Sequence, residues 1–280
     1  MNIITDNATL LSLVPNVEIT VEGERTLYEK INPWLVMAEH WVSYSFTGDA
    51  VLATIAAAPT TTVWHQVATL IAHEALRRAI PHLDLVLTPN GFGVVSNQTV
   101  APASKERVER LIASCRAQRD HCMELLLASL TSRPEWQSTS QRAWLNATLL
   151  QSPRDCVEAV HGVDFAGDRW EAFLQLRDAA RVVEAEIAEK WVSAALMTRL
   201  RCALSAYPMV ADDVNLALHV RRCVLDELAG KPRNCRALDR IVNHVRQQPE
   251  EYPEWAESST AALWAPPVFR NTKESKGYFF

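Results

Sequence analysis

Hydrophobic residues recur at spacings of three and four along most of the chain, which is the pattern of helices with one buried face. The clearest case is residues 170–194, where seven apolar side chains follow this spacing. Start signals precede several such runs, because Asn32-Pro33, Thr62 and Asp168 each place a capping residue ahead of periodic sequence. The pattern predicts helices at 33–46, 49–58, 62–78, 104–130, 169–194, 211–229 and 234–248.

Residues 83–100 change to the alternating apolar and polar pattern of β-strands. Asn90-Gly91 supplies the positive φ angles of a tight turn, and Phe92 opens the returning strand. A two-stranded ribbon is marginal in water by itself, so we expect this hairpin to project and to pack on helices or on a neighbouring subunit.

Part of the pattern occurs twice. The tripeptide Pro-Glu-Trp at 134–136 recurs at 253–255, and residues 28–52 can be laid against residues 173–197. Repeated segments of this kind favour an internal duplication of one structural unit. The expected fold is therefore mainly α, a multi-helix bundle with internal duplication, one projecting β-hairpin and an extended C-terminal arm. The expected boundaries are an N-terminal helical repeat at 1–150, with its hairpin at 83–100, a C-terminal helical repeat at 151–264, and the arm at 265–280.

Composition narrows the function classes. The 280 residues include only eight glycines, which argues against nucleotide-binding folds built on glycine-rich loops. The net charge of −5 argues against nucleic-acid binding by the whole surface. The N-terminus lacks a basic segment followed by an apolar core, and no stretch approaches about 18 consecutive apolar residues, so we expect no signal peptide and no membrane contact.

Catalytic and metal-binding motifs are not visible. His73-Glu74 begins like a zinc-protease motif, but Arg77 stands where the second histidine is required. The six cysteines are scattered without a close pair, which is typical of reduced cysteines that serve as small buried apolar groups. We therefore expect no enzymatic activity, no cofactor and no metal.

Basic residues concentrate between positions 221 and 246, where acidic residues are fewer. Such a face could contact packaged DNA or an acidic partner, whereas the simpler reading is a solvated helix face. The residues of this predicted basic face are Arg221, Arg222, Arg233, Arg236 and Arg240.

Aromatic residues gather near predicted loops and at the end of the chain. Trp136, Trp144 and Trp255 could equally hold a segment on its own domain or anchor it in a partner. Pro266-Pro267 favours an extended path for the arm, and its terminal aromatics are expected to dock on the chain itself or on the next subunit. The predicted partner contacts are Trp264, Phe269, Tyr278, Phe279, Phe280, Asn90 and Phe92.

The segment from Phe269 to Phe280 resembles the ending of a family of uncharacterised structural proteins from phages and prophages of gut bacteria. Residues 82–100, the Pro-Glu-Trp after a long helix, and residues 177–184 resemble the same family. The resemblance implies a virion protein, made in the host cytoplasm, that serves as a head–tail connector (adaptor). Helical subunits of this kind would form a homo-oligomeric ring at the phage neck, in contact with portal, tail or other neck proteins.

Two other function classes remain open at this point. The chain could be a bacterial helical module that binds proteins or regulates them without enzymatic activity. A helical enzyme with a site between the two halves would need a convergent cluster of reactive side chains, which the sequence does not show.

Overall fold

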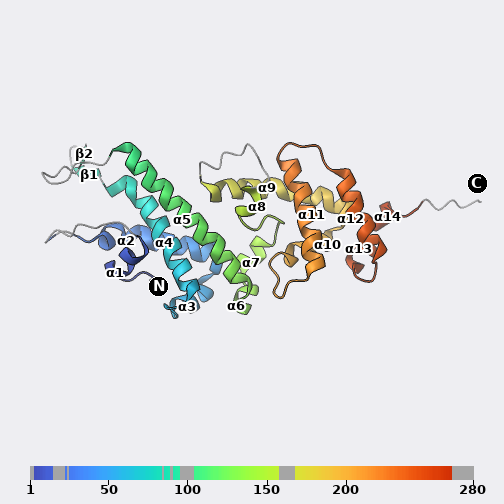
Figure 1. The fold of residues 1–280 in the computed structure, drawn as a ribbon, viewed down its shortest axis with the longest axis horizontal. Coiled ribbons are helices and arrows are strands. Elements are labelled where there is room, and N and C mark those ends of the chain that lie inside the picture. The colour runs from blue at the N-terminus through green and yellow to red at the C-terminus, as the bar shows by residue number, and fades with distance from the viewer. Residues whose placement is uncertain are drawn as a thin grey trace, which may run out of the picture.

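Helices make up nearly all of the regular structure in the computed structural model of the chain (Figure 1). The structure describes residues 3–14, 23, 25–83, 85–88, 91–94, 104–157 and 168–266. The prediction of a mainly helical protein is confirmed. The first half comprises α1 (Asn7–Leu13), α2 (Leu27–Val42), the π-helical turn η1 (Ser43–Thr47), α3 (Asp49–Ala56), α4 (Thr62–Leu83), α5 (Lys105–Thr131), α6 (Pro134–Gln137) and α7 (Ser140–Leu145). The second half comprises α8 (Arg154–Val157), α9 (Arg169–Ile187), the π-helical turn η2 (Ala188–Val192), α10 (Ala194–Ala203), α11 (Ala211–Leu228), α12 (Cys235–Gln247), α13 (Pro253–Ala256) and α14 (Ser259–Leu263).

Three predicted helices had wrong boundaries. The helix predicted at 169–194 ends at Ile187, because η2 and the reversal at Ser193 interrupt it before α10 begins. Helix α2 begins at Leu27, because Thr26 and Glu29 form a capping box in which each side chain accepts the other residue's backbone N–H. These bonds satisfy the first free donors of the helix well ahead of Pro33, which lies inside it. Helix α4 likewise continues through Pro81 to its end at Leu83, beyond the predicted end at residue 78.

The only strands in the described residues form a small antiparallel sheet. Strand β1 (Leu85–Thr88) pairs with strand β2 (Gly91–Val94), with Leu85 opposite Val94 and Thr88 opposite Gly91. The turn residue Asn90 lies outside the described residues. Whether this ribbon projects and contacts another subunit stays a prediction.

The halves lie end to end in an elongated molecule (Figure 1). In the first half, α4 packs between α2 and α5. Ala68, Ala72 and Ala75 on α4 are fully buried, and their small side chains let the neighbouring helices approach closely. In the second half, α11 packs against α9, α10 and α12.

Both halves contain the same unusual helix ending. Helix α2 widens into η1, a reversal follows at Gly48 (φ 73°, ψ 159°), and α3 begins. Helix α9 widens into η2, Ser193 takes nearly the same conformation (φ 73°, ψ 151°), and α10 begins. Few residues other than glycine adopt this backbone region, so its appearance at Ser193 is notable. The two positions lie 145 residues apart (193 − 48).

A tryptophan then fixes each of these turns. The Trp136 Nε1–H donates to the Phe46 carbonyl oxygen over 2.7 Å, and the Trp255 Nε1–H donates to the Trp191 carbonyl oxygen over 2.7 Å. Phe46 and Trp191 are also 145 residues apart, and both donor tryptophans are buried. Trp136 and Trp255 therefore hold segments of their own chain, which is the first of the two interpretations given for these residues.

A third pair of matching contacts involves a buried glutamate. Glu39 accepts the Ile3 backbone N–H over 2.9 Å, and Glu184 accepts the Leu149 backbone N–H over 2.8 Å. In each half the segment that enters the fold is thus fixed to the last turn of the long helix, α2 or α9. Chain direction, helix ending and tryptophan contact agree between the halves.

Candidate functional site

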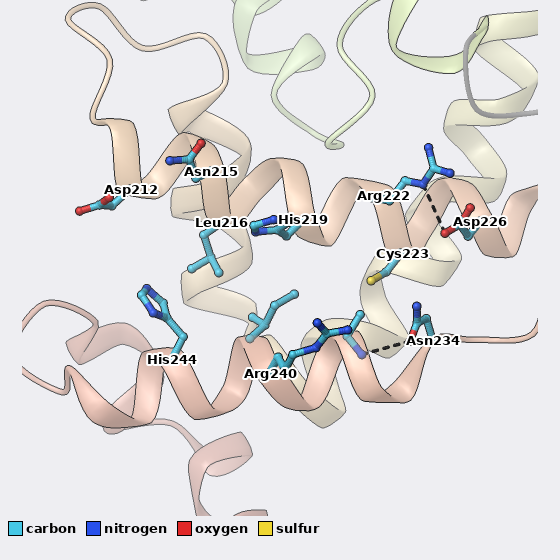
Figure 2. Close-up of a pocket in the computed structure, with 12 residues that line it drawn as sticks. Asp212, Asn215, Leu216, His219, Arg222, Cys223, Asp226, Asn234, Arg240 and His244 are labelled. Atoms are coloured by element: carbon cyan, nitrogen blue, oxygen red, sulfur yellow. Dashed lines mark hydrogen bonds and ion pairs between the residues drawn. The ribbon is translucent and has the colours of Figure 1, made fainter.

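A cavity in the second half lies between α11 and α12, which run side by side (Figure 2). This α11/α12 groove has a volume of about 480 Å³. His219 lines it from α11, and Arg240 and His244 line it from α12, whereas Arg222 borders it with its guanidinium directed toward Asp226. Positions 219 and 222, like 240 and 244, are spaced so that both side chains share one helix face.

The polar lining of the groove comprises two arginines, two histidines, two aspartates and two asparagines. Arg222 reaches Asp226 at 3.4 Å, and Lys231 reaches the same carboxylate at 2.8 Å, so these cations hold the pKa of Asp226 below its usual value. The Arg240 Nε–H donates to the Arg236 carbonyl oxygen, and no carboxylate of the described residues lies within ion-pair distance of its guanidinium. The groove therefore offers the donors of Arg240 together with the carboxylate of Asp212 at its other end.

The five arginines of the predicted basic face do not act as one surface. Arg221 is paired with Asp155 of α8, and Arg233 is paired with Glu227 and with Glu186 of α9. These partners neutralise much of the charge of Arg221 and Arg233. Asp155 and Glu186 come from α8 and α9, outside the basic segment itself. Of the remaining three, Arg222 is paired as described above, whereas Arg236 and Arg240 are exposed. Contact with DNA stays a prediction.

The predicted partner contacts are only partly described by the structure. Trp264 is half-buried on its own chain, and its Nε1–H donates to the Lys190 carbonyl oxygen over 2.9 Å. Beside it, Leu263 is 68% exposed. Phe92 lies on β2 and its side chain is not described. Phe269, Tyr278, Phe279, Phe280 and Asn90 lie outside the described residues.

A buried polar cluster joins the two halves, and it was not predicted from the sequence. Arg119 on α5 is buried with 1% of its side chain exposed. Its guanidinium contacts both carboxylate oxygens of Asp168, at 2.7 and 3.0 Å, together with Asp120 at 2.6 Å and Glu74 at 3.3 Å. Asp168 is also the N-cap of α9 and accepts the Trp170 backbone N–H. One arginine of the first half therefore fixes the start of the first long helix in the second half.

Burial and charge oppose each other in this cluster. Burial by itself raises the pKa of Glu74 and of Asp168, but hydrogen bonds and positive charge from Arg77 and Arg119 outweigh it and hold both below their usual values. For Asp120 burial prevails and raises the pKa despite Arg119. One sequence signal for this cluster was available, because Arg119 interrupts the apolar face of the helix predicted at 104–130. Its partners Glu74 and Asp168 lie far away in sequence, so the signal did not identify them.

A second buried arginine holds the connection between the halves. Arg177 donates to the carbonyl oxygens of Trp144, Leu145 and Leu150, and its guanidinium lies 4.1 Å from the Trp144 ring centroid. Burial lowers the pKa of Arg177 to about 10. Trp144, still 42% exposed, is therefore part of the junction within this chain.

Metal ligands and reactive thiols are the remaining chemical candidates. In the residues that the structure describes, no three His, Cys, Asp or Glu side chains come together as a metal site. All six cysteines are free, and four of them are buried. Burial raises the pKa of Cys115 and Cys122 to about 11 and that of Cys156 to about 12, so these thiols are unreactive at neutral pH.

Comparison with known proteins identifies one partial similarity. Residues 18–145 match a family described as a family of unknown function (DUF6712). The match ends at Leu145, the last residue of α7, and so covers the first half alone. No curated protein and no solved structure shows significant similarity to the chain. Among the described helices, none combines the length and the apolar character needed to cross a bilayer.

Proposed function

We propose that this protein is a non-enzymatic structural subunit that assembles with copies of itself, and that it serves as a phage head–tail connector (adaptor) in a ring between portal and tail. The observation that carries the self-assembly is the repeated helical unit. Within the chain the first unit receives the start of the second, where Trp170 packs on Trp41 and Phe46, and copies of the chain are proposed to meet in the same head-to-tail order. The phage role is supported by the resemblance of residues 269–280 to virion proteins.

We infer that the two halves are copies of one unit. Three kinds of contact support this: the Gly48 and Ser193 reversals, the Trp136 and Trp255 hydrogen bonds, and the glutamate that fixes each entering segment. All three kinds keep the same 145-residue separation in α2–η1 and α9–η2, from Glu39, Phe46 and Gly48 to Glu184, Trp191 and Ser193. Unrelated helical segments would share neither a π-helical ending nor its tryptophan partner.

The proposed arm begins where Trp264 is fixed to the body of its own chain. Three terminal aromatics in water would be an apolar liability in every subunit, so the arm is proposed to dock on a neighbouring subunit in the ring. Docking in a groove of its own chain is the other outcome of the test.

The test is molar mass measured by light scattering over a wide range of concentration, for the full chain and for a chain truncated after Asn271. A discrete oligomer whose particles appear as closed rings by electron microscopy supports the connector role. Truncation is expected to weaken oligomerisation while the unfolding midpoint of the monomer stays the same. An oligomer unchanged by truncation would place the arm on its own chain.

The alternative function is a helical protein-binding or regulatory module, and the α11/α12 groove is the observation that favours it. A chain that stays monomeric at all concentrations contradicts the connector proposal and favours the module. In that case the unpaired Arg240 makes an acidic segment the first ligand class to test.

A further inference from the structure

The loop between α10 and α11 exposes three large apolar side chains in a row of four residues. Tyr207 is 70% exposed, Met209 is 66% exposed and Val210 is 57% exposed. We call Tyr207, Met209 and Val210 the loop patch. Single exposed apolar residues are ordinary on a protein surface, whereas several together mark a contact surface.

Comparison of the two units indicates that the fold itself does not require the loop patch. The loop between α3 and α4, residues 57–61, occupies the equivalent place in the first unit. It consists of alanine, proline and threonine alone. The second unit therefore carries large apolar side chains where the first unit folds with small or polar ones. A partner outside the unit is the physical reason that remains for keeping them on the surface.

Acidic side chains gather at the end of α11 that follows the loop patch. Asp212 is exposed in the first turn of α11 (Figure 2). Asp213 and Glu251 lie near it, because burial and the charges of Asp213, Asp212 and Glu251 together raise the pKa of Tyr252. Arg199 pairs with Asp213 at 2.9 Å, whereas Asp212 and Glu251 have no ion-pair partner in the part of the chain that the structure describes. An apolar surface thus adjoins negative charge that the chain leaves unpaired.

The C-terminal arm, residues 265–280, carries the complementary side chains. It contains four aromatic rings, and its cations outnumber its one carboxylate: Arg270, Lys273 and Lys276 stand against Glu274. The arm leaves the body after Trp264, near α14 at one end of the elongated molecule (Figure 1). The loop that carries the patch instead adjoins the junction of the halves, where the Ser205 hydroxyl donates to Asn146 Oδ1 over 2.7 Å. Residues 267–280 span about 46 Å when fully extended, which is enough to reach an adjacent copy.

We propose that the loop patch of one copy of this chain binds the C-terminal arm of a second copy, with the aromatic rings of the arm on the patch and its cations beside Asp212 and Glu251. The proposal rests on the self-assembly proposed above and names the surface on which the arm docks. The interface is head-to-tail, because different surfaces of the two copies meet. Such an interface closes into a ring or continues as a filament, depending on the rotation between copies.

The apolar and the charged parts of this contact have different roles. Burial of the aromatic rings against the loop patch supplies most of the affinity, since exposed charge pairs contribute little. The opposite charges orient the arm and speed its association. Salt is therefore expected to weaken the contact without abolishing it, because exposed charges are screened and apolar burial is not.

The experiment titrates the full chain into a fluorescently labelled peptide of residues 265–280 and follows the anisotropy of the peptide. Tyr207→Ser and Met209→Ser are each expected to raise the dissociation constant about tenfold. Asp212→Lys combined with Glu251→Lys is expected to raise it severalfold at low salt and less at high salt. A peptide with serine at positions 278–280 is expected not to bind.

Matched control variants make the same changes away from the loop patch. Val182→Ser and Asp178→Lys lie on the exposed face of α9 and are expected to bind the peptide as the wild type does. Sedimentation equilibrium of the same full-length variants measures assembly. The patch variants are expected to raise the dissociation constant of the oligomer by similar factors, and the controls are expected to leave it unchanged.

The outcomes separate this contact from the proposed function. If the wild type assembles and the patch variants bind the peptide and assemble equally well, the loop patch is wrong and the self-assembly stands. If the wild type assembles but does not bind the peptide, docking of the arm on the patch is wrong. If the peptide binds the patch while the wild type is monomeric throughout, the self-assembly is overturned, and with it the assignment to a second copy. Far-UV circular dichroism and an unfolding curve establish that each variant is folded.

Discussion

Replacing Arg119 by methionine is expected to destabilise the protein by about 3–5 kcal/mol at pH 7, the usual result of removing one partner from a buried ion pair. The guanidinium is 99% buried by its neighbours, with 1% of the side chain exposed, and it contacts three carboxylates. Without it, Glu74, Asp120 and Asp168 face one another with less positive charge between them. Methionine keeps the apolar stem, so the loss reports the charge and its hydrogen bonds.

The loss should shrink as the pH falls. The folded-state pKa values of Glu74 and Asp168 are held below their usual values, so these carboxylates stabilise the fold above their unfolded-state pKa values, and this stabilisation is lost on acidification. In Arg119→Met their pKa values rise, because the neighbouring positive charge is gone and burial remains. Protonation then relieves the repulsion in the variant near pH 4, where the wild type has itself begun to weaken.

The measurement is urea unfolding at pH 7 and at pH 4 for the wild type, Arg119→Met and two comparison variants. Arg119→Lys keeps the charge without the forked geometry and is expected to be intermediate. Arg110→Met lies exposed on the same helix and should change stability by less than about 0.5 kcal/mol. A loss below about 1 kcal/mol for Arg119→Met at pH 7, or a loss that grows at pH 4, would refute this account of the cluster.

Three further predictions follow from the repeated unit and from the thiols. Trp136→Phe and Trp255→Phe each remove one indole N–H from a backbone carbonyl, and urea unfolding should show similar losses of about 1–3 kcal/mol, whereas losses that differ several-fold would contradict their equivalence. Gly48→Ala should cost about 1–3 kcal/mol in the same assay, because φ is 73° and the new Cβ would lie 2.9 Å from Gln141 Oε1; a neutral effect would disprove the strain. In a thiol titration of the folded protein, the exposed Cys235 should react first, and rapid reaction of the buried cysteines would show that the core opens.

Periodicity alone determined the class of fold and the long helices, whereas short helices such as α1, α6 and α8 were not predicted. Helices 104–130, 211–229 and 234–248 were predicted within about two residues of their ends, because one apolar face and local caps specify a helix without distant partners. The start of α2 was missed because two signals competed, and the capping box of Thr26 with Glu29 outweighed the pair Asn32-Pro33.

Tertiary structure decided the roles of the polar and aromatic residues. Pro-Glu-Trp was visible twice in the sequence, but only the fold shows that Trp136 reaches a carbonyl 90 residues away. The basic run appeared continuous, yet the fold brings Asp155 to Arg221 and Glu186 to Arg233. Arg119 likewise meets Asp168 across 49 residues. A helix depends on neighbours three and four residues away, which the sequence displays directly, whereas the partner of a buried charge depends on how distant helices pack, which periodicity does not encode.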